Sequence, residues 1–307
     1  MTLYRGGFLR IITADREYTY EAMKEDIRRL KSEYPFLEVF SIGNSVLGKE
    51  IPCIRWGQGD KKIFINGAHH GKEWITALLL LRMLEELCYH YQNRTAVGCT
   101  DIHQYYRSAS VYFCPMVNPD GVNLCINGLT DNIPLPIRTR LIGANKDSKD
   151  FVGKWQANIH NYDAAFAKGK FYEGQLGIFT PAPTRYSGES PESEPESQAV
   201  AGFTRSLSPD IVLAYHSQGE VIYYDFEGKA TPRAKQMAKD LSELSGYGLD
   251  ESDGMASCSG YKDWVIQEFY IPAFTIEVGL GENPLPLSQF DKIFDDNLKI
   301  LLYFAQG

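Results

Sequence analysis

The chain lacks any segment that could cross a membrane. Its longest apolar run, around Leu78 to Leu81, is interrupted by Arg82, whereas a membrane-spanning helix needs roughly 18–20 apolar residues. The first residues, from Met1 to Arg5, lack the apolar core and the small-residue cleavage site of a secretory signal. We therefore expect no membrane partner and a cytoplasmic location.

Clustered basic charge and paired cysteines are also missing. The 307 residues carry a net charge of −8, and such a surface disfavours nucleic-acid backbones, which bind clustered Lys and Arg. None of the six cysteines forms a C-x-x-C pair. In a chain of this length, scattered cysteines indicate reduced, partly buried thiols of a cytosolic protein rather than a disulfide framework. The six are Cys53, Cys88, Cys99, Cys114, Cys125 and Cys258.

The sequence does contain short apolar strands that alternate with amphipathic helices, a pattern that favours an α/β fold. There is no internal repeat, low-complexity linker or abrupt change in composition, so we expect residues 1–307 to form a single domain. We predict a central, twisted, mixed and mostly parallel sheet flanked by helices. The expected strands are 37–42, 51–56, 62–65, 110–114, 211–215, 221–224 and 273–277, and the expected helices are 21–34, 74–92, 193–203, 234–244 and one from about 288.

Between residues 129 and 190 the pattern is irregular and rich in Gly, Pro, Asn and aromatic residues. This segment is too long for a simple connection, so we expect it to carry function or to cover a site. Just before it, Asn118-Pro119-Asp120-Gly121 is a strong turn signal. Just after it, Ser193-Glu194-Pro195-Glu196 is typical of a capping box with Pro in the first helical turn.

The sharpest local motif is His70-Gly71-Lys72-Glu73, which lies between an apolar strand and an apolar helix. A His and a Glu three residues apart at such a junction can turn an imidazole and a carboxylate toward one point. A hydrolytic zinc site needs about three such ligands and an open position for water. The alternative is coincidence, because a lone H-x-x-E occurs in many chains without catalytic purpose.

Two further side chains stand at the ends of apolar strands. His216 follows Ile211–Ala214, and Glu277 ends the run from Phe274. Active groups of open α/β sheets gather at the carboxyl ends of strands, and an unpaired carboxylate is costly to bury there. In isolation, His216 could equally be a hydrogen-bonded structural residue, and Glu277 could form a salt bridge.

Taken together, these segments resemble the zinc carboxypeptidase family, and the match runs from about Tyr18 onward. The features that recur in that family, in this order, are Gly67–Trp74 with its H-x-x-E signature, Asn118–Gly121, His216-Ser217, Asp263-Trp264 and the strand that ends in Glu277. Other stretches resemble the bacterial subgroup that cleaves the γ-D-glutamyl–diaminopimelate bond of cell-wall peptides. These are Trp155–Asn158, Ser193–Glu196, His216–Glu220 and Gly281–Pro286.

The resemblance implies one zinc ion bound by His70, Glu73 and His216. Zinc would lower the pKa of its bound water and polarise the scissile carbonyl. Glu277 would take the proton of that water and pass it to the leaving amine. An arginine should stabilise the oxyanion; Arg138 best matches the family position, and Arg140 is the alternative.

Two residues stand next to the predicted ligands. His69 precedes His70 on an extended segment, where neighbouring side chains point in opposite directions, so we expect a structural role for His69. Ser217 follows His216 and is a candidate for contact with the substrate.

The sequence departs from the family where its members grip a terminal carboxylate. Instead of the usual run of Asp, Asn and Arg, it reads Trp155 to Phe166 with His160-Asn161-Tyr162 at the centre. The carboxylate clamp is therefore altered, and both exopeptidase and endopeptidase action remain open. Asn158, His160 and Asn161 are candidates for substrate binding; the alternative is that they are ordinary polar loop residues.

A second group of residues concerns side-chain specificity. Lys262 lies where these enzymes set specificity, and a cation there could meet an acidic group such as a diaminopimelate carboxylate; the alternative is a solvated surface lysine. The tyrosine that pancreatic-type members carry upstream falls on Met255, so its hydrogen bond is expected to be missing. Arg185 is a further possible contact for an anion.

The resemblance thus implies a zinc metallopeptidase that hydrolyses the γ-D-glutamyl–diamino-acid amide of soluble muropeptides. One alternative is a carboxypeptidase acting on ordinary peptides, or a deacylase of amino-acid derivatives. An alternative of another class is a zinc-containing peptide-binding protein that has lost catalysis. Retention of all three ligands and of Glu277 argues against the last alternative, since a pure binder has no evident use for a general base.

Overall fold

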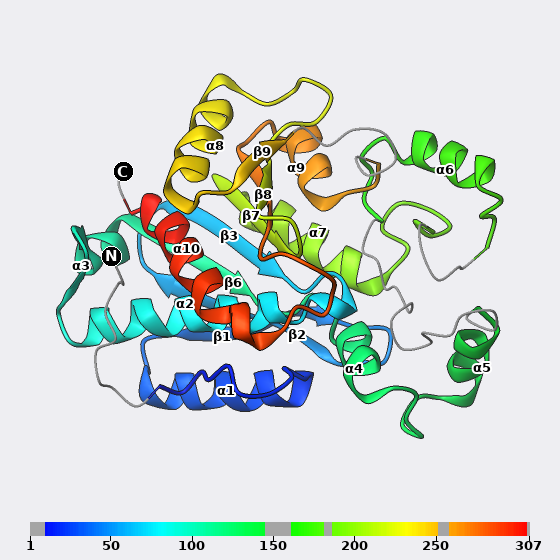
Figure 1. Ribbon diagram of the computed structural model, residues 1–307, viewed down its shortest axis with the longest axis horizontal. Coiled ribbons are helices and arrows are strands. Elements are labelled where there is room, and N and C mark those ends of the chain that lie inside the picture. Colours follow the sequence, from blue (N-terminus) through cyan, green and yellow to red (C-terminus); the bar gives the residue numbers. More distant parts are fainter. Residues whose placement is uncertain (1–9, 145–160, 181–185, 251–257, 306–307) are drawn as a thin grey trace.

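The computed structural model describes residues 10–144, 161–180, 186–250 and 258–305 (Figure 1). The strands of the main sheet are β1 (Glu38–Asn44), β2 (Glu50–Gly57), β3 (Lys61–Gly67), β6 (Ala109–Cys114), β7 (Ile211–His216), β8 (Val221–Tyr223), β9 (Gly248–Asp250) and β10 (Ala273–Glu277). A small hairpin is formed by β4 (Ala96–Val97) and β5 (Thr100–Asp101).

Helices surround the sheet. They are α1 (Tyr20–Glu33), α2 (Ile75–Gln92), α3 (Ile102–Ser108), α4 (Pro119–Asn127), α5 (Leu135–Ala144), α6 (Phe166–Gln175), α7 (Pro195–Leu207), α8 (Pro232–Ser245), α9 (Tyr261–Phe269) and α10 (Phe290–Tyr303). Two short 3-10 helices are η1 (Gly71–Glu73) and η4 (Leu287–Gln289). In the part of the chain that the structure describes, none of the helices combines the length and the apolar character needed to cross a membrane.

The main sheet has the strand order β1-β2-β6-β3-β7-β10-β8-β9. Its centre is parallel, because β6, β3, β7 and β10 all run in one direction, and β8 is parallel to β9. The pairs β1–β2, β2–β6 and β10–β8 are antiparallel. The predicted α/β fold with a mixed, mostly parallel sheet is therefore confirmed.

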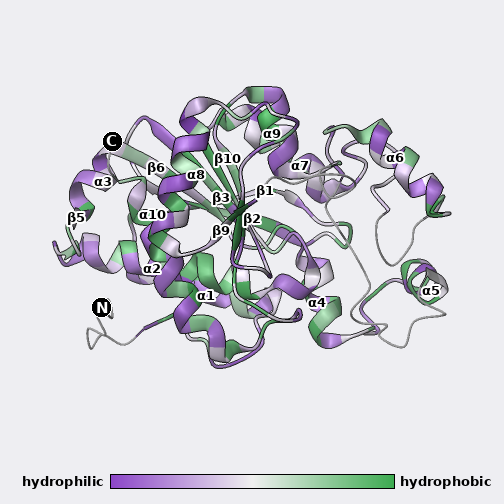
Figure 2. Ribbon diagram, turned by 45° about the horizontal axis from the view of Figure 1, so that its top comes forward, coloured by the Kyte–Doolittle hydropathy of each residue, from purple (hydrophilic) through white to green (hydrophobic). Residues whose placement is uncertain are grey.

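Both faces of the central strands are buried, as expected for a parallel sheet covered by helices. Successive residues of β3 point to opposite faces: Ile63 and Ile65 join a core with α1, α2, α3, α8 and α10, whereas Phe64 joins a core with α7 and α9 (Figure 1). Figure 2 shows hydrophobic residues concentrated in these strands and hydrophilic residues on the outward sides of the helices.

Helix α2 passes through the first of these cores. Leu78, Leu79, Leu80 and Leu81 are all fully buried, which confirms that the apolar start of this helix belongs to the core. A helix that is apolar on most faces is stable only when neighbours cover it on several sides. The helix that carries the metal-site loop at its start is therefore firmly fixed.

Two local predictions were wrong. Asn118-Pro119-Asp120-Gly121 begins α4 rather than a turn: the Asn118 side chain accepts a hydrogen bond from the Gly121 amide, and Pro119 occupies the first helical position. These residues favour helix starts as well as turns, so the pattern was ambiguous.

The capping box at the start of α7 is also absent. The Ser193 hydroxyl donates to Glu194, and the Glu196 carboxylate accepts from the backbone amide of Val46. Tertiary contacts thus replaced the local pair. The segment 129–190 is less irregular than expected, since it contains α5 and α6, which both lie at the same end of the molecule (Figures 1 and 2).

Candidate metal centre

The candidate site lies at the carboxyl ends of three adjacent parallel strands, β3, β7 and β10. His70 follows β3 by three residues, and Glu73 ends η1. His216 is the last residue of β7, and its backbone pairs with that of Glu277, the last residue of β10. Residues far apart in the sequence are therefore brought to one edge of the sheet, as predicted from the strand ends.

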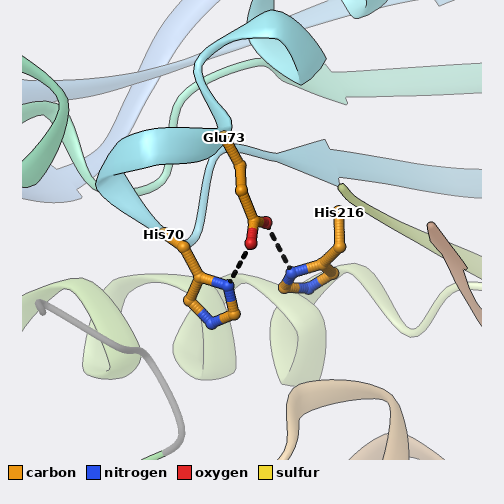
Figure 3. Close-up of side chains that lie close together, drawn as sticks. All are labelled: His70, Glu73 and His216. Carbon is orange, nitrogen blue, oxygen red and sulfur yellow. Dashed lines mark hydrogen bonds and ion pairs between the residues drawn. The ribbon is translucent and has the colours of Figure 1, made fainter. Parts of the chain in front are cut away.

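His70, Glu73 and His216 converge on one point (Figure 3). Glu73 bridges the two imidazoles: its Oε1 lies 2.8 Å from His70 Nδ1, and its Oε2 lies 3.0 Å from His216 Nδ1. The ligand atoms of all three residues lie within 4.8 Å of one another. Two imidazole nitrogens and one carboxylate form a donor set that suits a catalytic zinc ion, which uses three protein ligands. The residues present therefore fit this metal.

The electrostatics of Glu73 and His216 favour the states in which they bind a metal. For His70, burial lowers the pKa, but the charge and hydrogen bond of Glu73 outweigh burial and raise that pKa, and this imidazole must lose its proton to bind. Burial raises the pKa of the Glu73 carboxyl, but the charge of His70 and hydrogen bonds with both histidines outweigh burial and hold that pKa below its ordinary value. Burial lowers the pKa of His216. An ionised carboxylate and a neutral imidazole are the forms that coordinate metal.

Glu277 stands beside this centre. It is partly exposed at the end of β10, with its backbone paired to that of His216. Burial, and then the negative charge of Glu73, raise its pKa well above the ordinary value. A carboxyl group with a raised pKa at the edge of a metal site has the properties of a group that exchanges protons during a reaction.

The loop that carries His70 is fixed by the start of α4. The Asn118 side chain donates to the His69 carbonyl at 3.2 Å, and the Asn118 amide donates to the Ala68 carbonyl at 3.1 Å. Gly71 packs so closely that a Cβ there would lie 2.5 Å from the carbonyl oxygen of Gly121. The Asn118–Gly121 motif therefore supports the metal-site loop.

His69 is not among the three residues whose ligand atoms converge, and its buried contacts suit the expected structural role. It is 1% exposed, its Nε2 lies 2.6 Å from Asn66 Oδ1, and its ring stacks on those of His216 and Tyr261. The stacking supports one face of the His216 imidazole.

Arg138 lies on α5 and forms an ion pair of 2.7 Å with Asp131, which is fully exposed. Arg140 is exposed on the same helix. Among the residues that the structure describes, neither arginine forms a hydrogen bond or an ion pair with the metal centre or with Glu277. The choice between the two arginines, and a contact of either with an oxyanion, stay predictions.

Ser217, the candidate for substrate contact, is hydrogen-bonded to Asn283. The Ser217 hydroxyl donates to Asn283 Oδ1 at 2.7 Å, and Asn283 Nδ2 donates to the Ser217 carbonyl at 2.5 Å. Asn283 Nδ2 also lies 3.5 Å from Glu73 Oε1. The stretch Gly281–Pro286 resembles the subgroup that cleaves the γ-D-glutamyl–diaminopimelate bond, but the sequence alone predicted no role for Asn283.

Asn161 is 1% exposed, and its amide holds the neighbouring loop. It donates to the carbonyls of Ser187 and Ser190 and accepts from the Glu194 amide. Asn158, His160, Arg185 and Met255 lie outside the described residues. Contact of Asn158, His160 or Asn161 with a substrate stays a prediction.

Lys262 is only 3% exposed, so it is not a solvated surface lysine. Its Nζ donates to the Asp225 carbonyl at 2.6 Å and forms an ion pair of 2.5 Å with Asp263. The sequence shows that Lys262 and Asp263 are adjacent, but it does not show that both are buried. Recognition of an acidic substrate group by Lys262 stays a prediction.

Known proteins resemble this chain along most of its length. Residues 23–300 match the model of the zinc carboxypeptidase family. The γ-D-glutamyl-L-diamino acid endopeptidase 1 of Lysinibacillus sphaericus is 40% identical over 295 residues, which cover 95% of this chain and 73% of the relative.

Solved structures share the fold at low identity. Bovine thrombin-activatable fibrinolysis inhibitor, solved with a tick carboxypeptidase inhibitor, has a TM-score of 0.70 at 17% identity, covering 95% of this chain and 97% of the other. The murein-tripeptide amidase MpaA of Escherichia coli O157 has a TM-score of 0.52 at 16% identity, covering 86% and 91%. The family match and the described site agree, and the chain belongs to the zinc carboxypeptidase family of metallopeptidases, which makes it a hydrolase.

Proposed function

We propose that the protein binds one zinc ion through His70, Glu73 and His216 and hydrolyses the γ-D-glutamyl–diaminopimelate amide of cell-wall muropeptides. The observation that carries the chemistry is the convergence of three ligand atoms within 4.8 Å beside Glu277. Zinc bound to such a set acts as a Lewis acid, which polarises the scissile carbonyl and makes water more acidic.

The chain's own residues supply the proton transfers. Glu277 takes a proton from the attacking water and delivers it to the leaving amine, and such general acid–base catalysis contributes typically about 10²–10⁴-fold. Its raised pKa suits this role because a carboxyl group must be able to hold the proton between the two steps. Arg138, or Arg140 in its place, would stabilise the negative charge that develops on the carbonyl oxygen.

The substrate class is supported by the relative in Lysinibacillus sphaericus, which is a γ-D-glutamyl-L-diamino acid endopeptidase and 40% identical. The sequence stretches typical of that subgroup include Gly281–Pro286, which brings Asn283 to the metal centre. All six cysteines are free thiols, which supports a reducing compartment such as the cytoplasm and therefore soluble muropeptides as substrates.

The test compares two substrates on the purified protein, zinc-loaded and chelator-stripped: L-Ala-γ-D-Glu-diaminopimelate and an ordinary peptide with a free C-terminus. Glu277→Gln serves as the control that keeps the ligands but removes the base. We expect zinc-dependent release of diaminopimelate and a loss of about 10²–10⁴-fold in the variant.

Each other outcome selects an alternative. Cleavage of the ordinary peptide alone would retain the chemistry and overturn the cell-wall substrate. Tight zinc binding without turnover of either substrate would favour a peptide-binding protein that has lost catalysis.

A further inference from the structure

Asn283 lies at the meeting point of two predicted metal ligands. Its Nδ2 lies 3.5 Å from Glu73 Oε1 and 2.5 Å from the carbonyl of Ser217, the residue after His216. Its Oδ1 accepts the Ser217 hydroxyl at 2.7 Å. One side chain therefore contacts Glu73 directly and is tied to His216 through the next residue.

The contacts with Ser217 fix which end of the Asn283 amide faces Glu73. The Ser217 hydroxyl donates to Oδ1, and the Ser217 carbonyl needs a donor, which Nδ2 provides. Turning the amide over would break the bond to the Ser217 carbonyl and place an oxygen against both that carbonyl and the Glu73 carboxylate. The N–H group is thus held toward Glu73.

The loop that carries Asn283 is itself anchored. Gln289 accepts from the Leu280 amide at 3.0 Å and donates to the Leu280 carbonyl at 2.7 Å. On the other side of Asn283, Leu285 is 1% exposed in the main core. The position of Asn283 is therefore set by its flanks and does not depend on Glu73 alone.

We propose that Asn283 is a positioning residue that orients the Glu73 carboxylate, and through Ser217 the end of β7, for metal binding. A carboxylate ligand that bridges two imidazoles can rotate, and a second donor restricts that rotation. Outer partners of metal ligands typically contribute about 10–100-fold to metal affinity. The inference rests on the proposed zinc site but not on the identity of the substrate.

The experiment measures zinc affinity by competition with a chromogenic chelator for the wild type, Asn283→Ala and Ser217→Ala. We expect Asn283→Ala to bind zinc at least about 10-fold more weakly. Ser217→Ala removes the bond to Asn283 Oδ1 but keeps the backbone carbonyl that binds Nδ2, so its loss should be smaller. The visible spectrum of the Co²⁺-loaded Asn283→Ala protein should also change, because the coordination by Glu73 changes.

Gln289→Ala is the matched control, since it loosens the same loop without removing a contact to Glu73 or Ser217. Its zinc affinity should stay within about twofold of the wild type, because the bonds of Asn283 to Ser217 and the burial of Leu285 still hold the loop. Equal losses in Gln289→Ala and Asn283→Ala would assign the effect to loop packing and overturn the proposal, as would unchanged affinity in both Asn283→Ala and Ser217→Ala.

Ser217→Ala also decides the question if Asn283→Ala fails to fold: unchanged zinc affinity and an unchanged Co²⁺ spectrum would then overturn the proposal. Because no substrate is used, failure to cleave muropeptides leaves this test intact. A wild type that binds no zinc would instead overturn the proposed function and this inference together.

Discussion

Glu196 has a buried carboxyl group at the start of α7, and this group binds a backbone amide of a loop. It is 3% exposed and accepts a hydrogen bond of 3.0 Å from the Val46 amide in the loop between β1 and β2. Burial raises its pKa to about 7, the Val46 hydrogen bond opposes this rise, and the nearby charges of Asp120 and Glu194 add to it. Asp120 is in turn paired with Lys49. Ionisation of Glu196 is therefore unfavourable in the folded protein.

Glu196→Gln should remove a pH-dependent loss of stability. The folded pKa lies above that of the unfolded chain, so the wild type loses free energy of unfolding as pH rises from about 4.5 to about 7 and stays lower above that range. The glutamine keeps an oxygen for Val46 but does not ionise. The variant's stability relative to the wild type should rise by up to about 3 kcal/mol between pH 5 and pH 8.

Urea denaturation of both proteins at pH 5, 6.5 and 8 would measure this difference. The comparison cancels the titration of groups that both proteins share. A difference that is independent of pH would contradict the enclosed, neutral carboxyl group.

Among single residues, those whose residue type and position suggest metal binding could be predicted from the sequence. His70 and Glu73 were identifiable from their spacing, and His216 from its place at a strand end. Asn283 was not, because its contact with Glu73 spans 210 residues and an asparagine in a loop carries no signal of its own. Burial of Lys262 was hidden for a similar reason, since its contact with Asp225 depends on tertiary packing.

At the scale of elements, the close contact between η1 and α4 determines where Glu73 lies. Gly71 faces the backbone of Gly121, and a Cβ at residue 71 would lie 2.5 Å from the carbonyl oxygen. No flexible side chain is available to move aside, so the two elements would have to separate.

Gly71→Ala should therefore destabilise the protein and weaken zinc binding together. Overpacking of this kind costs typically about 1–3 kcal/mol, and a shift of η1 displaces Glu73. Gly202→Ala in α7 is the matched control, because its Cβ would meet nothing within 4 Å; it should be neutral or stabilising by up to about 1 kcal/mol. Thermal unfolding and chelator competition would measure both effects, and retention of wild-type zinc affinity in Gly71→Ala would disprove the coupling.

Elements with a clear apolar pattern were predicted well, and those defined by tertiary contacts were not. The helix 234–244 and the strand 273–277 correspond to α8 and β10. Helices α3 and α9 were missed: α3 has only seven residues, and α9 carries the Asp263-Trp264 motif, which was interpreted as chemistry rather than structure. The capping box failed because Glu196 bonds to a loop 150 residues away.

For the whole molecule, strand alternation with helices was sufficient to predict the α/β class, because central parallel strands must be apolar on both faces. It was not sufficient for the strand order, in which β6 lies between β2 and β3 and β10 between β7 and β8. That order places β3, β7 and β10 side by side and so assembles the metal centre. The strand order itself was not predicted; the family resemblance, rather than periodicity, implied that His70, Glu73 and His216 share one metal site.

Removal of zinc should lower the thermal stability of the protein without unfolding it. The two cores that cover the sheet contain most of the buried apolar residues, and they do not depend on the metal ligands. Zinc at a free concentration of 100 times its dissociation constant would add about 2.7 kcal/mol, which for a chain of this size is a shift of a few degrees. This differs from small zinc-folded domains, which lose their structure with the metal.

Circular dichroism and calorimetry of the chelator-treated protein would measure this prediction, with stability restored by added Zn²⁺. His216→Ala should show the lower stability and no response to zinc, because it lacks one of three ligands. Loss of the far-ultraviolet circular dichroism signal in chelator would mean that the metal holds the sheet together. That result would contradict a metal centre that the fold assembles before zinc binds. The hydrogen bonds of Glu73 to both imidazoles argue for such preassembly, since they hold the three ligands together through the protein's own contacts.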